Sequence, residues 1–323
     1  MVRYALRRVL IAIPLLLGIS FVTFAFIQAA PGNYFDTLRL NPEVSEATIR
    51  QYEATYHLDK PLLVQYGYWL SNLARGDLGY SFAFRSPVLR VIAGRVGNTL
   101  ILTVLSMILT WLIAIPLGIY GALRQNHWQD RALSLFAFIG MSVPSFFLAL
   151  LLLTVAAKTG WLPLGGMRSA AFRDLSAAGQ WLDLAAHLVI PALVISIGSL
   201  AGLQRLMRGN VLEVLRAPYI VTARAKGLRE SRILYVHALR NALNPMITLF
   251  GYELSSLLSG AALTEIICNW PGLGSLMLAA VRQQDLFLVM GSMLIGGVLL
   301  LAGNLVADFL LALSDPRIRY EKL

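Results

Sequence analysis

The side chains that could perform chemistry in this chain are few, and they are not grouped as an enzyme needs. The four histidines lie far apart in the sequence, at His57, His127, His187 and His237. No His-Glu-x-x-His pair is present for zinc, and no Gly-x-Ser-x-Gly turn marks a serine nucleophile. The pair Gly-Lys never occurs, which excludes a phosphate-binding loop for ATP hydrolysis. The sequence therefore predicts no catalytic residue, no metal site and no cofactor in this chain.

Ionisable residues inside apolar runs are the next candidates, because a charge within a membrane is costly and usually functional. Glu253 lies inside one apolar run and Glu265 lies at the end of the same run, with Ser256 between them. These three are the candidate substrate-pathway residues. The pattern favours the alternative for Glu253, a hydrogen-bond partner between helices or a cavity-lining group. One carboxylate at mid-depth is a weak basis for a proton-coupled carrier.

Cations are concentrated in one stretch, ARAKGLRESRILYVHALRNALNP, although only 14% of the chain is charged and 57% is hydrophobic. The composition predicts two short helices separated at Gly227, since glycine commonly ends a helix. Val236, Leu239 and Leu243 share one face of the second helix, and arginines surround them, which is typical of a docking face. The alternative is that these cations only set the topology and contact anionic lipid.

The elements that must position these residues are apolar runs long enough to cross a membrane, which takes about 20 residues. Six such runs can be read: Val9–Ala29, Thr99–Tyr120, Leu133–Ala157, His187–Leu206, Pro245–Ile267 and Leu286–Leu313. Their length and number disfavour a large soluble helical bundle. The apolar core of the first run is about 19 residues, longer than that of a signal peptide, so we expect it to be retained. The sequence predicts an all-α polytopic membrane protein with six transmembrane helices.

The basic residues indicate how the chain lies in the membrane. With the N-terminus inside, cytoplasmic segments hold Arg3, Arg7 and Arg8, then Arg124 and Arg131, then the run from Arg205 to Arg240, and finally Arg317, Arg319 and Lys322. The short outer loops hold fewer cations. This asymmetry predicts a multi-pass membrane protein with both termini in the cytoplasm. The net charge of +10 is therefore topological and does not indicate nucleic acid.

Four segments follow from this layout: residues 1–30 (tail and first helix), 31–98 (an extracytoplasmic cap), 99–313 (a five-helix core with the cytoplasmic loop 207–244) and 314–323 (a cytoplasmic tail). The cap is expected to hold helices over 42–57 and 61–76, a turn-rich connector, and an amphipathic helix over 86–99. Pro14, Pro116, Pro144 and Pro191 all lie within spans, where a kink is tolerated. Gly198-x-x-x-Gly202 is expected to allow close helix packing, and Cys268 has no intrachain partner for a disulfide.

YIVTARAKGLRESRILYVHALRNALNP resembles the cytoplasmic coupling loop of ABC-importer permeases of the dipeptide and oligopeptide branch. The general signature of such loops is Glu-Ala-Ala, three residues, then Gly. Val221-Thr222-Ala223 stands in place of the triplet, so its Glu is absent, whereas the match to the peptide branch is close to complete. Five other segments of the chain resemble the same branch and occur in the same order: GDLGYSF, SVPSFFLALLLL, HLVIPAL, TEIICNWPGLGSL and DPRIRY.

The resemblance implies a type I importer permease of the bacterial plasma (inner) membrane that forms half of a translocation pathway. Its partners would be a second, homologous permease, two cytoplasmic ATP-binding subunits that carry ATP and Mg²⁺, an extracytoplasmic substrate-binding protein, and membrane lipid. It assigns ATPase coupling to Tyr219, Thr222, Ala223, Arg224, Ala225, Lys226, Gly227, Leu228 and Leu239. It assigns contact with the binding protein to Asp77, Trp270, Pro271 and Gly272. The alternative for NWPGLG, residues 269–274, is a tight turn joining two helices.

Two other functions remain open at this point. The first is a permease of the same family for nickel or glutathione, because selection in this family rests largely with the binding protein. The second, in a different class, is an ion-coupled secondary carrier or channel. Dependence on a separately encoded ATPase distinguishes the two classes, because a carrier would transport without one.

Overall fold

The computed structural model describes residues 2–32, 34–39 and 45–314, and the side chains of most of them. It is helical apart from one pair of two-residue strands among these residues. The chain forms two compact units, Met1–Thr99 with Pro271–Leu301 and Leu100–Trp270 with Ala302–Leu323. The first unit thus combines the predicted cap with the first helix and with a late segment of the chain. These lie in three different segments of the layout predicted from the sequence.

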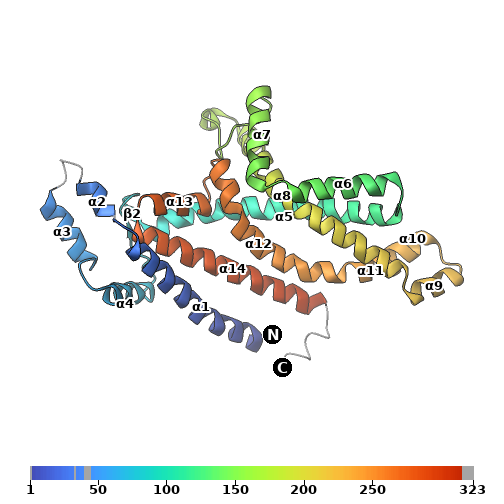
Figure 1. Cartoon of the computed structure of the whole chain (residues 1–323), viewed down its shortest axis with the longest axis horizontal. Coiled ribbons are helices and arrows are strands. Elements are labelled where there is room, and N and C mark those ends of the chain that lie inside the picture. Colours follow the sequence, from blue (N-terminus) through green and yellow to red (C-terminus); the bar gives the residue numbers. More distant parts are fainter. Residues whose placement is uncertain (1, 33, 40–44, 315–323) are drawn as a thin grey trace. The chain divides into compact units, whose positions relative to one another are not determined.

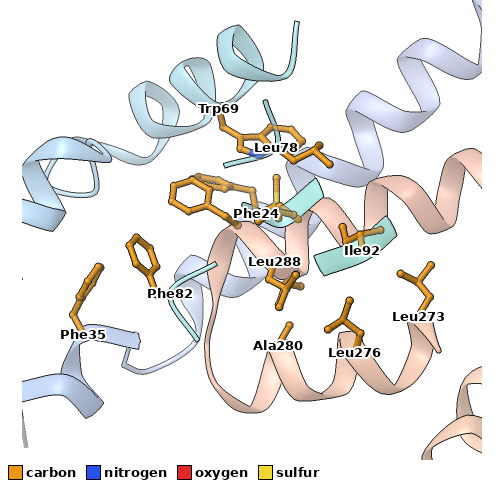
Figure 2. Close-up of a cluster of buried hydrophobic side chains, with 14 of the residues drawn as sticks. Phe24, Phe35, Trp69, Leu78, Phe82, Ile92, Leu273, Leu276, Ala280 and Leu288 are labelled. Atoms are coloured by element: carbon orange, nitrogen blue, oxygen red, sulfur yellow. The ribbon is translucent and has the colours of Figure 1, made fainter. Parts of the chain in front are cut away.

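The first unit contains most of the predicted cap. Its complete elements are α1 (Val2–Ala29), α2 (Tyr34–Arg39), α3 (Glu46–Thr55), α4 (Leu62–Leu73), β1 (Tyr80–Ser81), β2 (Ser86–Pro87) and α13 (Leu273–Arg282). Helices α5 (Val88–Leu123) and α14 (Leu286–Ser314) begin in it. Figure 2 shows its core, in which aromatic side chains of α1, α2, α4 and the strand loop lie near aliphatic side chains of α13 and α14.

The expected cap helices are present with shifted ends. Ser45 caps α3 by accepting a hydrogen bond on Oγ from the Thr48 backbone N–H (3.2 Å), so the described helix begins at Glu46. Residues 42–44 lie outside the described part. Gly76, with a φ of 81°, follows α4 as expected. The amphipathic helix expected over 86–99 continues without a break into the second span as the 36-residue α5.

A buried carboxylate explains the strand pair in the predicted connector. Asp285 is fully buried and accepts hydrogen bonds from Ser81 Oγ (2.7 Å) and from the backbone N–H of Ala83 (3.0 Å) and Leu288 (3.3 Å). Burial raises the pKa of the Asp285 carboxyl, while these hydrogen bonds act to lower it. One side chain therefore fixes the turn after β1 and also caps α14.

The second unit is built around α8 (Ala177–Leu215), a single helix of 39 residues. It packs against α6 (Trp128–Ser142), α7 (Ser145–Thr159) and α12 (Asn244–Ile267). Its close contact with α5 is at Gly118, where an added Cβ would lie 2.7 Å from Met207 Cβ. At Gly198 and Gly202 a Cβ would meet nothing within 4 Å, so neither glycine makes a close helix contact within this chain.

Within the part of the chain that the structure describes, four helices are long and apolar enough to cross a membrane: α1, α5, α8 and α14. The predicted third span, Leu133–Ala157, is not one helix but α6 and α7, which meet at 101°. Val143 is extended, with φ −88° and ψ 120°, because the ring of Pro144 disfavours a helical residue before it. A pair bent in this way is either a broken fifth span or a re-entrant loop.

Helix α12 covers the predicted fifth run, Pro245–Ile267. Most of its side chains from 251 to 260 lie outside the described part, and it is not among the four spans. Large apolar side chains elsewhere point outward, including Phe26, Leu112 and Phe136, each about or above two-thirds exposed. Such exposure suits contact with lipid or with partner subunits. The all-α polytopic fold is confirmed, and a count of six spans stays a prediction.

Candidate functional site

The cation-rich stretch is an ordered segment at the end of α8, visible in Figure 1 as α9 to α11. It comprises α9 (Pro218–Ala225), α10 (Glu230–Arg232), the π-helix η2 (Ile233–Ala238) and α11 (Leu239–Ala242). The short helix predicted before Gly227 is α9, which is separate from the preceding helix because α8 ends at Leu215 and Pro218 starts α9. Proline suits that first position, since its missing N–H has no partner there in any helix.

Gly227 ends α9 as the sequence predicts. Its φ is 75°, its N–H donates to Arg224 O (2.9 Å), and the Leu228 N–H donates to Ala223 O (3.3 Å). These two bonds form a Schellman motif, in which the left-handed residue is usually glycine. A Cβ on Gly227 would meet nothing within 4 Å, so the glycine is required by the backbone and not by packing within this chain.

A small buried cluster holds α9 onto η2. Ile220, Ala223, Ile233 and Ala238 are buried together, and Leu228 packs against them. Ile220 of α9 is a fully buried member of this cluster. Because η2 runs through α11 towards α12, this cluster fixes α9 relative to the start of α12.

Polar contacts add to this packing. Asn241 Nδ2 donates to Tyr219 Oη (2.7 Å), which ties α11 to α9. Arg224 and Glu230 form an exposed ion pair at 2.8 Å across the Gly227 turn. The hydrogen bond from Arg224 lowers the pKa of the Glu230 carboxyl and raises that of the guanidinium. Two of the predicted coupling residues, Tyr219 and Arg224, therefore also brace the segment.

The end of α8 that carries this segment is fixed to α6 by a charged pair. Arg208 Nε and Nη2 donate to the two carboxylate oxygens of Asp130 (2.6 and 2.7 Å), and the Asp130 side chain is 4% exposed. Asn210 Nδ2 also donates to Ala242 O (3.2 Å), which connects α8 to α11. These contacts connect the segment to α8, and through α8 to α6.

The nine predicted coupling residues divide by exposure. Tyr219, Thr222, Arg224, Ala225, Lys226 and Gly227 are exposed, Ala223 is buried, and Leu228 and Leu239 are half-buried. Leu239 packs against the cluster around Met246, so it faces inward and is not on the outer face. The last three residues thus hold the segment together from inside.

Two exposed apolar side chains of this segment are missing from the predicted set. Val221 is 56% exposed and Tyr235 is 69% exposed, and Val236, assigned to the predicted docking face, is 54% exposed. A π-helix carries more residues per turn than an α-helix, so the α-helical periodicity misplaces side chains across η2. Tyr219, Val221, Tyr235 and Val236, which we call the outer apolar set, are the large apolar side chains that the segment leaves exposed.

Truncating Ile220 is expected to release α9. Ile220→Ala removes the centre of the buried cluster, at a cost of about 2 kcal/mol or more, so amide exchange in α9 should accelerate roughly 30-fold. Hydrogen exchange followed by mass spectrometry measures this. The matched control is Val221→Ala on the exposed face of the same helix, which should leave exchange near that of the unmodified protein. Equal protection in both variants would contradict the role of the cluster.

The candidate substrate-pathway residues all lie in α12. Glu253 is half-buried, Glu265 is fully buried, and the side chain of Ser256 is outside the described part. Full burial of Glu265 means that other parts of the same chain cover it.

The predicted contacts for a binding protein also differ in exposure. Asp77 is exposed and accepts a hydrogen bond on Oδ1 from the Gly79 N–H (2.8 Å). The ring of Trp270 is fully buried in a cluster with Leu102 and Leu188, and Gly272 is buried as well. Trp270 thus supports its loop from inside and presents no ring to a partner. Pro271 is half-buried.

Within the described residues, no group of three or more His, Cys, Asp or Glu side chains is arranged to hold a metal ion. Burial raises the pKa of the Cys268 thiol to about 11, so it stays protonated near neutral pH.

The chain matches known protein families over nearly its whole length. Residues 114–320 match the family described as the inner membrane component of binding-protein-dependent transport systems, and residues 1–103 match its N-terminal part. The chain is 41% identical over 322 residues to the oligopeptide transport system permease protein AppB of Bacillus subtilis (strain 168), covering 99% of this chain and 100% of that protein. It is 34% identical over 339 residues to the dipeptide transport system permease protein DppB of Escherichia coli (strain K12), with 100% of each covered.

A solved structure shares the fold. An inward-facing structure of the MetNI methionine ABC transporter contains a chain that matches with a TM-score of 0.51 and 17% sequence identity, covering 69% of this chain and 97% of that chain. At this identity the match is informative about the fold alone.

Proposed function

Because this chain belongs to the family of binding-protein-dependent inner membrane transport components, we propose that it is the permease subunit of an ATP-driven importer for dipeptides or oligopeptides. It is a transport subunit and not itself an enzyme. The observation that carries the proposal is the braced helix α9 at the end of α8, with exposed side chains on its outer side. A permease that hydrolyses no ATP must receive work through such a rigid attachment.

The proposed assembly has partners on both sides of the membrane. A second, homologous permease completes the translocation pathway, and two ATP-binding subunits with their ATP and Mg²⁺ dock on the cytoplasmic side. An extracytoplasmic binding protein delivers substrate. We place six helices in the membrane, with residues 31–98 outside and both termini in the cytoplasm.

In this mechanism the outer apolar set and the exposed residues of α9 enter a groove on one ATP-binding subunit. Apolar side chains supply most of the contact energy, and the surrounding arginines pair with carboxylates of the partner. When the ATP-binding subunits close, α9 moves with them. The buried cluster and the Asp130–Arg208 pair then pass that movement to α8, α6 and α12.

The pathway itself is assigned to α12. Glu253 and Ser256 are proposed to face the substrate, and the buried Glu265 to support the outer end of the pathway from inside. On the outer face, Asp77 and Pro271 are proposed to contact the binding protein, with Trp270 and Gly272 holding the loop that presents Pro271. Membrane lipid surrounds the assembly, and nucleic acid is not a partner.

Reconstitution tests this proposal. The chain alone in liposomes is expected to move no peptide, and uptake should appear only with the second permease, both ATP-binding subunits, the binding protein and ATP. Uptake of a radiolabelled tripeptide is the measurement, with nickel and glutathione as alternative substrates. Peptide uptake by the chain alone, or uptake that follows an ion gradient without ATP, would instead identify a secondary carrier or channel. Uptake of nickel or glutathione in place of peptide would correct the substrate class.

A further inference from the structure

A cavity of about 450 Å³ lies within the first unit, apart from the coupling segment. It is formed by the turn between α3 and α4, the side of α4, the strand pair and Phe287. Its volume is in the range of pockets that hold small molecules, about 300–1,000 Å³. Of the residues that line it, the proposed transport mechanism uses only Asp77, as a contact for the binding protein.

Aromatic rings form much of its lining. His57 and Tyr68 stack with centroids 3.8 Å apart and planes at 18°, and Tyr56 lies roughly parallel to Tyr80 at 6.4 Å. Trp69 also lines it and is 3% exposed, and its Nε1–H has no hydrogen-bond partner among the described atoms. A buried indole N–H usually has a partner, so this donor is available to a hydrogen-bond acceptor on a ligand, and not to a cationic group, which is itself a donor.

The backbone is strained at the same place. His57 has a φ of 58°, in the left-handed region that residues other than glycine seldom adopt. Such a conformation costs about 1–2 kcal/mol and is concentrated at functional sites. Here it turns the chain between α3 and α4 and places the imidazole ring on Tyr68.

The charge of the cavity is negative. Asp77 lines it, and no Lys or Arg does. One oxygen of Asp77 accepts from the Gly79 N–H, and the side chain is otherwise exposed. Burial raises the pKa of the Tyr56 hydroxyl, as do the charges of Tyr80, Tyr52 and Asp77, so the carboxylate acts on the ring-lined interior. The nearby Lys60 is paired with Asp59 at 2.9 Å.

We propose that this cavity binds a small organic cation, a primary ammonium group carried on an apolar or aromatic body. Aromatic faces attract a cation through their quadrupole, and the carboxylate of Asp77 supplies the opposite charge. The rings also cover the apolar body of such a ligand. The free amino terminus of a short peptide has this chemistry, an extension that rests on the proposed function.

Two probes of equal shape test the proposal. The full chain in phosphatidylcholine nanodiscs is titrated with 2-phenylethylammonium and with neutral 2-phenylethanol, with empty nanodiscs as the blank. Saturation-transfer NMR gives both dissociation constants. The ammonium probe is expected to bind about tenfold tighter. Equal affinities for the two probes would overturn the proposal.

Variants assign the site. Asp77→Asn keeps an acceptor for the Gly79 N–H but removes the charge, and Tyr68→Leu removes one ring; each should weaken the ammonium probe about tenfold. Glu46→Gln, an exposed acid of α3 outside the lining, makes the same change in net charge and should leave binding unaltered. Ammonium binding that survives both cavity variants would overturn the assignment. Peptide uptake is measured separately, so such a result leaves the proposed function standing.

Discussion

Gly227→Val is expected to abolish transport while leaving the protein inserted in the membrane. Valine in the left-handed region costs about 1–2 kcal/mol or more, because its branched Cβ collides with its own backbone. The two bonds of the Schellman motif would then open, and α9 would lose its defined end. We expect transport and transport-coupled ATP hydrolysis to fall at least about tenfold.

The matched control is Gly227→Asn, because asparagine adopts the left-handed conformation more readily than other residues with a side chain. Space around Gly227 is open within this chain, so the two variants differ mainly in backbone cost. Uptake by reconstituted transporter is the measurement, with the amount of inserted protein determined by immunoblot. A normal rate for the valine variant would contradict the coupling role. Equal loss in both variants would show that volume at the partner's surface matters, and not the backbone.

Arg208→Met is expected to give the largest loss of stability. The substitution leaves the carboxylate of Asp130 buried without its partner, which costs about 3 kcal/mol or more for a buried pair. The backbone N–H of Asn126 still donates to Asp130 (3.0 Å), but it cannot neutralise the charge. The thermal unfolding midpoint in detergent should therefore fall by several degrees.

Two further variants isolate the cause. Combining Arg208→Met with Asp130→Asn should restore most of the loss, because no unpaired charge then remains. Arg205→Met, one turn earlier on α8, removes an exposed arginine whose guanidinium lies 4.6 Å from the Phe138 ring centroid, and it should have little effect. If Arg205→Met and Arg208→Met lower the midpoint equally, the ion pair is not the source.

The sequence was sufficient to predict the helical fold class, the series of apolar segments and the end of α9 at a glycine. These features depend on local composition and on one residue with a special backbone conformation, both of which can be read along the chain. The broken span could be predicted only in part. Pro144 indicates a kink, but whether two half-helices stay aligned or meet at 101° depends on the neighbours they pack against.

Contacts between residues that are far apart along the chain could not be predicted from the sequence. Asp130 and Arg208 are 78 positions apart, and Ser81 and Asp285 are 204 apart, so nothing in local spacing pairs them. Gly118 shows the same limit, because the tight helix contact occurs at a glycine without a repeated motif. In the coupling segment, the π-helix shifts side chains off the expected face, which is why Tyr235 was missed and Leu239 was placed outside.

The length of α8 has a mechanical consequence. Thirty-nine helical residues make a rod about 58 Å long at 1.5 Å per residue. Tilting such a rod by about 10° around its centre would carry each end about 5 Å. Pro191 lies near the middle of the helix and cannot donate a backbone hydrogen bond, so the helix can pivot at this residue. A small displacement of one end of α8 would thus move the other end in the opposite direction, with little rearrangement of the residues between them.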